Sequence, residues 1–288
     1  MTRAIVSAAR CAGLVACAIA IIATLACRPA APAGQTFASP EDAAKELIAV
    51  AKRGSLDELM KLLGPEAQPL VESSDPQVAR QNRQVFVAAA AEGWRLEENG
   101  PDGRTLIVGN ESWPFPVPLV KDGARWRFDT AAGVEEVMAR RIGRNELAAI
   151  RACRTYVLAQ QLYASRGHDG KPAGLYATAL RSDPGKQNGL YWPASRGEKR
   201  SPLGDLIAEA GDPGKPPFHG YRFKLVKSGG AIGVALLAWP ATYDSTGVMT
   251  FVVAEDGVVR QKDLGPDTEQ AVSALDTSPA DSTWEAVN

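Results

Sequence analysis

The chain has 288 residues, of which 45% are hydrophobic and 23% charged, and its formal net charge is −1. This length is enough for two domains with their own apolar cores, and the composition is that of an ordinary globular protein. The balanced charge excludes the strongly basic surface that is typical of nucleic-acid-binding proteins, so we expect no nucleic-acid partner.

The first 27 residues have the pattern of an export signal. Arg3 and Arg10 precede an uncharged, apolar run that ends at Cys27. The run is slightly short for a membrane-spanning helix and ends in small residues, which is typical of a secretory signal peptide. Thr24-Leu25-Ala26 before Cys27 resembles a bacterial lipobox. We therefore expect a lipid on Cys27 and a flexible tether over residues 28–36.

Two other processing sites remain open. "LVAC" at Cys17 matches the lipobox pattern better but leaves a very short apolar core, and cleavage near Ala33 would leave no lipid. The expected location is the periplasmic side of the cell envelope. Apart from the lipidated Cys27, only Cys153 remains in the mature body, so we expect neither an internal disulfide nor a cysteine metal site.

Helical signals dominate from Phe37 to Gly93. Ser39 has the chemistry of an N-cap, Pro40 suits the first helical position, and Gly54 is a stop signal. We predict one helix up to Gly54, a second that ends at Gly64, and a third over residues 76–92.

Strand signals follow. "WRLEENGPDGRTLIVG" reads as strand, turn and strand, and "WPFPVPLVKDGARWRF" as a hairpin with Asp122-Gly123 as its loop. In this register Leu119 faces Trp126 and Val117 faces Phe128. All apolar side chains then share one face.

Three prolines, Pro114, Pro116 and Pro118, remove donors from one edge of this strand. Proline is tolerated at sheet edges, so we predict an edge strand. Its inward-facing residues would be Trp113, Phe115, Val117 and Leu119. The alternative is a polyproline strip that binds a partner domain.

The second half begins with a long amphipathic helix. We expect a hinge at Gly143 and a helix stop at Gly167. The predicted apolar face holds Ile150, Cys153 and Val157, widened by Leu147, Leu158 and Leu162. A loop-rich stretch, a short helix after Ser201-Pro202, three or four antiparallel strands and a short helix from Asp267 follow.

The fold class is therefore α+β with two domains, 37–142 and 143–288. The first would hold helices and a curved antiparallel sheet, and the second a long helix packed on an antiparallel sheet. Asp256-Gly257 predicts a two- or three-residue turn in the second sheet.

Signals for chemistry are few. His168 and His219 are isolated in sequence, and no nucleophile elbow, zinc-protease or phosphate-loop motif is present. We expect no metal and no cofactor, and favour a non-enzymatic protein. Tyr191, Trp192 and His219 are a candidate surface patch for an interaction.

Arginines cluster on the long helix among three glutamates. We expect a salt-bridged helical surface, with an anion or lipid-headgroup contact as the alternative. The residues are Arg140, Arg141, Arg144, Arg151 and Arg154, with Glu135, Glu136 and Glu146.

"WPFPVPLVKDGARWRFDTAAG", "GLYWP", "HGYRF" and "AWPATYDSTGVMTFVV" resemble domain-of-unknown-function family 2950, bacterial envelope proteins without an established activity. The first half is also similar to the nuclear-transport-factor-2-like fold, and the second to a pseudopilin globular head. The first of these likenesses implies a pocket lined by Trp94, Trp113, Trp126 and Phe128. The expected function is an envelope interaction or structural module with a protein partner; the alternative is a small-molecule binder or enzyme that uses this pocket.

Overall fold

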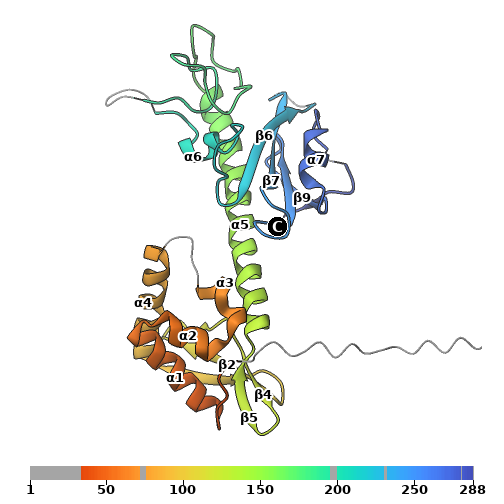
Figure 1. The fold of residues 1–288 in the computed structure, drawn as a ribbon. Coiled ribbons are helices and arrows are strands. Elements are labelled where there is room, and N and C mark those ends of the chain that lie inside the picture. Colours follow the sequence, from red (N-terminus) through yellow and green to blue (C-terminus); the bar gives the residue numbers. More distant parts are fainter. Residues whose placement is uncertain (1–33, 72–75, 195–199, 230–231, 280, 288) are drawn as a thin grey trace, which may run out of the picture.

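The computed structural model describes residues 34–71, 76–194, 200–229, 232–279 and 281–287. Helices and two antiparallel sheets form two units, and the helix α5 (Thr130–Ala164) runs from one to the other (Figure 1). The predicted α+β class, with a long helix packed on the second sheet, is confirmed. The predicted signal peptide and Cys27 lie outside the described residues. Within those residues, no helix is both long enough and apolar enough to span a bilayer.

Helices of the first unit begin and end where the capping signals predict. Ser39 Oγ accepts the N–H of Asp42 at 3.1 Å, and Gly54 adopts a left-handed φ of 74° that ends the first helix. The helical segments are α1 (Pro40–Arg53), α2 (Leu56–Leu63), the 3-10 turn η1 (Pro65–Ala67), α3 (Gln68–Val71) and α4 (Pro76–Glu92).

The first sheet has the strand order β1-β2-β4-β5, and the short β3 also pairs with β2. The helices pack on this sheet and enclose an apolar cluster that includes Leu47, Leu62, Leu106, Leu119 and Phe128. The strands are β1 (Trp94–Glu98), β2 (Gly103–Val108), β3 (Trp113–Pro114), β4 (Leu119–Asp122) and β5 (Arg125–Phe128).

The predicted hairpin register is wrong by two residues. Asp122 pairs with Arg125 and Leu119 pairs with Phe128, so Gly123 and Ala124 form the loop. Gly123 supplies the positive φ, 60°, that a tight hairpin loop requires. Because side chains alternate with a period of two, this shift leaves the apolar residues on the expected face.

The predicted edge strand is correct for β3, which contains Pro114 and pairs with β2 but with no other strand of the described sheet, and it is wrong for β4. β4 lies between β2 and β5, and the proline-rich chain separates β3 from β4. Phe115 N–H donates to the Leu106 carbonyl at 2.8 Å, so the intact donors point at β2. The proline nitrogens, which carry no hydrogen, therefore face the β5 side. The pairing of β4 with β5 ends on that side at Phe128. Val117 is buried as expected, but Trp113 is exposed.

The expected hinge at Gly143 is wrong because α5 is one continuous helix of 35 residues through that position. Its N-terminus is held by the Asp129 carboxylate, which accepts the N–H of Ala132, and by Thr130 Oγ1, which donates to the Leu63 carbonyl at 2.6 Å. The helix ends at Ala164, three residues before the predicted stop.

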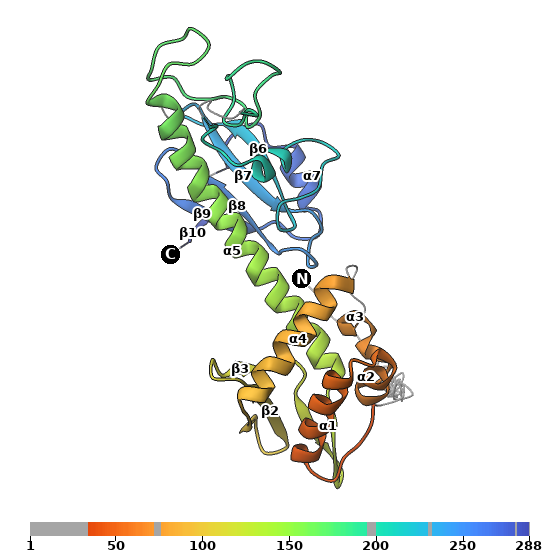
Figure 2. The ribbon, with the colours of Figure 1, turned by 90° about the vertical axis from the view of Figure 1, so that its left-hand side faces the viewer.

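The second unit is an antiparallel meander packed on the C-terminal half of α5 (Figure 2). The loop between β8 and β9 spans residues 254–258 and is longer than predicted. The elements are α6 (Asp205–Glu209), β6 (Tyr221–Lys227), β7 (Val234–Pro240), β8 (Met249–Val253), β9 (Val259–Asp263), α7 (Thr268–Ser273) and β10 (Glu285–Ala286).

Small side chains of α5 face this sheet. Ala149, Ala152, Cys153 and Ala159 are buried against large aromatic residues of the strands, such as Phe251. Helix and sheet thus interlock small side chains with large ones. Ile150, Cys153 and Val157 are buried as predicted. The prediction that three leucines widen this buried face is wrong, because all three are exposed: Leu147, Leu158 and Leu162.

Alanine substitution should change the stability of the fold in opposite directions at Gly133 and Gly143. A Cβ at Gly133 would lie 2.6 Å from Val117 Cγ2, whereas a Cβ at Gly143 would meet nothing within 4 Å. We expect Gly133→Ala to destabilise the fold and Gly143→Ala to stabilise it by about 0.5–1 kcal/mol, the helix-propensity gain. Urea unfolding of both variants measures the two effects. Loss of stability in Gly143→Ala would contradict a continuous helix.

Cys153 makes the second unit sensitive to alkaline pH. Burial raises the pKa of its thiol from the usual 9.0 to about 12. The unfolded chain loses this proton at lower pH than the folded chain, so the stabilisation is full below pH 9.0 and falls as pH rises towards about 12. We expect the urea midpoint to fall over this range and Cys153→Ala to reduce the fall. An unchanged slope in the variant would contradict the assignment.

Candidate functional site

The four aromatic residues predicted to line a first-unit pocket lie in the core of that unit and at its rim. Phe128 is fully buried, and Trp94 and Trp126 are partly buried against the same apolar cluster. Trp113 has 43% of its surface exposed. The structure thus places these residues around one cluster, at different depths.

Phe115, which the sequence analysis assigned only to packing, connects these rings. Its ring centroid lies 6.4 Å from that of Phe128 and 6.3 Å from that of Trp113, both edge-on. Phe86 of α4 packs on it at 5.3 Å. Edge-to-face contacts of this kind stabilise a packed core. Phe115 therefore links the rings of Phe86, Trp113 and Phe128.

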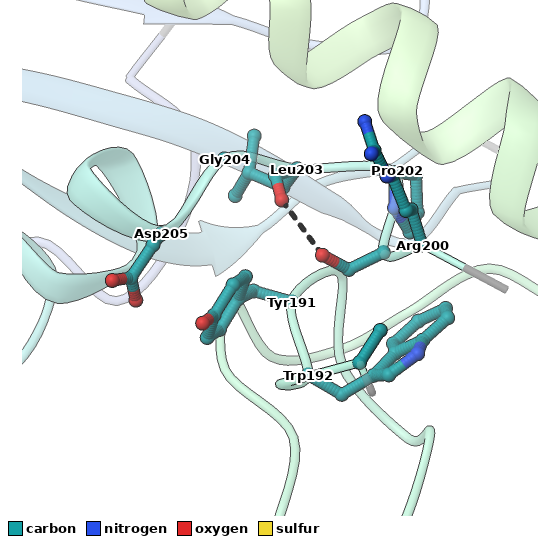
Figure 3. Close-up of a pocket in the computed structure, with 9 residues that line it drawn as sticks. Tyr191, Trp192, Arg200, Pro202, Leu203, Gly204 and Asp205 are labelled. Atoms are coloured by element: carbon teal, nitrogen blue, oxygen red, sulfur yellow. Dashed lines mark hydrogen bonds between the residues drawn. The ribbon is translucent and has the colours of Figure 1, made fainter. Parts of the chain in front are cut away.

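The second unit has a surface hollow of about 380 Å³ on the side of α6 (Figure 3). Tyr191 and Trp192 lie beneath the chain through Pro202 and Gly204, with Asp205 beyond Tyr191. The Ser201 hydroxyl donates to the Leu203 carbonyl at 3.0 Å and holds this chain in place. Two residues of the predicted patch thus contribute to one hollow.

Arg181 organises the wall next to this hollow. Its guanidinium carbon lies 4.8 Å from the centre of the Tyr191 ring, and it forms ion pairs with Asp212 at 2.8 Å and Asp205 at 3.3 Å. Desolvation and the nearby Asp205 carboxylate raise the pKa of the Tyr191 hydroxyl. Sequence reasoning missed Arg181 because it lies in a loop-rich stretch without periodicity.

A second hollow, of about 390 Å³, lies beyond the C-terminal end of α5. Its lining includes Tyr163, Arg166, His168, Asp169 and Lys171. The His168 ring stacks on Tyr163 with centroids 4.1 Å apart. Cationic and aromatic groups in a concave surface suit a small anionic or hydroxylated ligand.

Gln187 connects the loops around this hollow. Its backbone N–H donates to the Asp169 carboxylate at 2.8 Å, and its carbonyl accepts the Tyr163 hydroxyl at 2.8 Å. His168 Nε2 lies 3.0 Å from the Tyr163 carbonyl oxygen, which only accepts, so this nitrogen carries a hydrogen. His168 Nδ1 contacts the Gln187 side chain at 3.2 Å. Both ring nitrogens of His168 thus have polar contacts, and one face of the ring stacks on Tyr163.

His219, the third residue of the predicted patch, does not line either hollow. It lies two residues before β6 with a positive φ of 46° and packs edge-on against Phe218 with centroids 4.5 Å apart. Trp192 contacts His168 instead, with centroids 5.6 Å apart, and only 6% of its surface is exposed. Tyr191 therefore contributes more of the patch surface than Trp192 does.

Metal-ligating side chains are scattered over the fold. Among the described ranges, no group of three His, Cys, Asp or Glu side chains lies close enough together to hold a metal ion. The side chains around the two hollows instead offer hydrogen bonds, a cation–π contact and ion pairs.

Comparison with known families gives one match. A family model described as "Protein of unknown function (DUF2950)" matches residues 34–287. The chain belongs to this family. The match is continuous across both units and α5, so the family is defined by the two units together. No curated protein matches the chain, and no solved structure matches it.

Gln160 of α5 fixes the loops around the second hollow. It is fully buried, and its side chain bonds both the N–H and the carbonyl of Ala177, at 3.0 and 2.8 Å. Gln160→Leu leaves both backbone groups unpaired, so we expect a loss of about 2–4 kcal/mol in unfolding free energy. Exposed Gln161→Leu is the matched control, with an expected change within about 0.5 kcal/mol. Equal urea midpoints for the two variants would contradict this role.

Proposed function

We propose that this family member is a non-enzymatic lipoprotein of the cell envelope that acts as an interaction or structural module. The observation that carries the proposal is that a single helix, α5, belongs to both units. At about 1.5 Å per residue its 35 residues span about 52 Å. A helix packed at both ends holds two surfaces at a set separation, which suits a connector between partners.

The contacts of α5 support this connector role. Arg140 Nη1 donates to the Pro114 carbonyl at 2.9 Å, and its guanidinium carbon lies 5.5 Å from the centre of the Trp113 ring. Six residues later, Glu146 Oε1 accepts the N–H groups of Val248 and Met249, both at 3.0 Å. The crossing from one unit to the other thus takes less than two helical turns.

Attachment to a membrane through Cys27 would keep the first unit near the bilayer. The Gln35 N–H donates to the Leu62 carbonyl at 3.0 Å, so the folded unit begins at the end of the predicted tether. The eight residue steps from Cys27 to Gln35 span at most about 27 Å when extended. Processing at Cys17 would lengthen this tether, and cleavage near Ala33 would remove it.

The resemblance to a pseudopilin head that the sequence suggests concerns the helix and sheet of the second unit alone. In a pseudopilin, an apolar helix at the extreme mature N-terminus supports assembly. Here the N-terminal part of α5 is engaged with the first unit through Thr130 and Arg140. We therefore propose a module that contacts an envelope protein rather than one that polymerises.

Native mass spectrometry of the tagged protein, gently extracted from its own envelope, tests this function. We expect a stoichiometric protein partner and a mature chain that begins at a lipidated Cys27. Cys27→Ser should remove the lipid mass. A retained small molecule without a protein partner would overturn the proposal in favour of a ligand-binding protein. A chain that begins near residue 34 without lipid would contradict the anchor.

A further inference from the structure

The outer face of the C-terminal half of α5 exposes three leucines to solvent. The exposed fractions are 56% for Leu147, 65% for Leu158 and 47% for Leu162. The opposite face of the same turns packs on the second sheet, as Figure 2 shows for α5 lying across the strands. Clustered large apolar side chains on a surface mark contact sites, whereas single ones need no explanation.

Three arginines without partners share this face. Arg144, Arg151 and Arg154 are exposed, and they form no ion pair or side-chain hydrogen bond with any residue that the structure describes. Arg140, earlier on the helix, pairs with Glu136 at 2.8 Å. The prediction of a salt-bridged helical surface therefore holds for Arg140 and is wrong for Arg144, Arg151 and Arg154.

Among the described residues, no ion pair with an acidic side chain offsets this charge. Glu146 is the only Asp or Glu between Arg144 and Ala164. It points to the other side of the helix, where it accepts the N–H groups of Val248 and Met249. The face is thus cationic and apolar along about 27 Å of helix, the length of 18 residue steps.

The spacing on this face is that of a helix–helix seam. Leu147, Arg151, Arg154 and Leu158 are separated by steps of four, three and four, which Gln161 and Ser165 continue. This 3.5-residue period keeps side chains in line towards a partner helix that crosses at a shallow angle. The leucines offer apolar contacts, and the arginines between them require acidic groups opposite.

We propose that this face docks an acidic amphipathic helix of an envelope partner protein, an inference that rests on the proposed function. Charge complementarity selects this occupant. A second copy would bring arginines against arginines, which is repulsive. A membrane-surface helix keeps its cations at the borders of the apolar stripe, whereas Arg151 and Arg154 lie in line between the leucines.

Site-specific photo-crosslinking in the native envelope tests the proposal. Benzoylphenylalanine replaces Leu158 in the full-length protein, and the same group at Leu206 of α6, which is 64% exposed, is the matched control. We expect one protein product from position 158 alone. Its crosslinked peptide, identified by mass spectrometry, should lie in a segment with Glu or Asp and Leu at heptad spacing.

Charge reversal separates specific docking from chance contact. Arg151→Glu with Arg154→Glu should reduce the yield at position 158 about tenfold or more, because like charges would then face one another. Lys52→Glu with Arg80→Glu, two exposed cations of the first unit, changes net charge equally and should leave the yield unchanged. Thermal unfolding of each variant checks that the fold is retained.

The possible outcomes separate a failure of the docking surface from a failure of the proposed function. Products from position 206 and none from position 158 would overturn the docking face but leave the interaction module standing. A crosslink to phospholipid or to a second copy at position 158 would overturn the acidic-helix partner. No protein product from either position, together with no partner in native mass spectrometry, would overturn both proposals.

Discussion

The rest of the structure depends on the continuity of α5. Within six residues, Arg140 bonds the Pro114 carbonyl of the first unit and Glu146 accepts two N–H groups of the second. A bend between these contacts would break one set, because each acceptor and donor is fixed by its own sheet. The two cores are therefore coupled through helix backbone and not through direct packing of sheet on sheet.

The same constraint explains the unusual composition of α5. Its sheet-facing side carries alanines and Cys153 because Tyr221, Phe223 and Phe251 of the strands already fill the space between the layers. Tyr156 and Tyr163 are the large side chains of α5 buried on that side, whereas Leu158 lies on the opposite, exposed side. The exposed leucines of α5 and the arginines that pair with none of the described residues thus lie together on its solvent-facing side.

Backbone donors decide how the proline-rich strand pairs. The loss of N–H groups at alternate positions was visible in the sequence, but which neighbour would meet the intact edge was not. β2 takes that edge through the Phe115 donor, and the proline side ends the pairing with β5. Aromatic packing follows from this arrangement, because Phe115 is then held between Phe128 and Trp113.

Local chemistry was enough to place most of the helices and strands of this protein. Ser39, Gly54 and Gly64 mark helix ends through hydrogen bonds and φ angles that act within a few residues, and the α+β class follows from the order of helical and alternating patterns. The tertiary structure alone decided the strand neighbours, the unbroken helix at Gly143 and the width of the buried side of α5. Those outcomes depend on the volumes and hydrogen-bonding groups of residues far away in the chain. The hollows have the same origin, since Arg181 and Gln187 gain their roles only where distant loops meet.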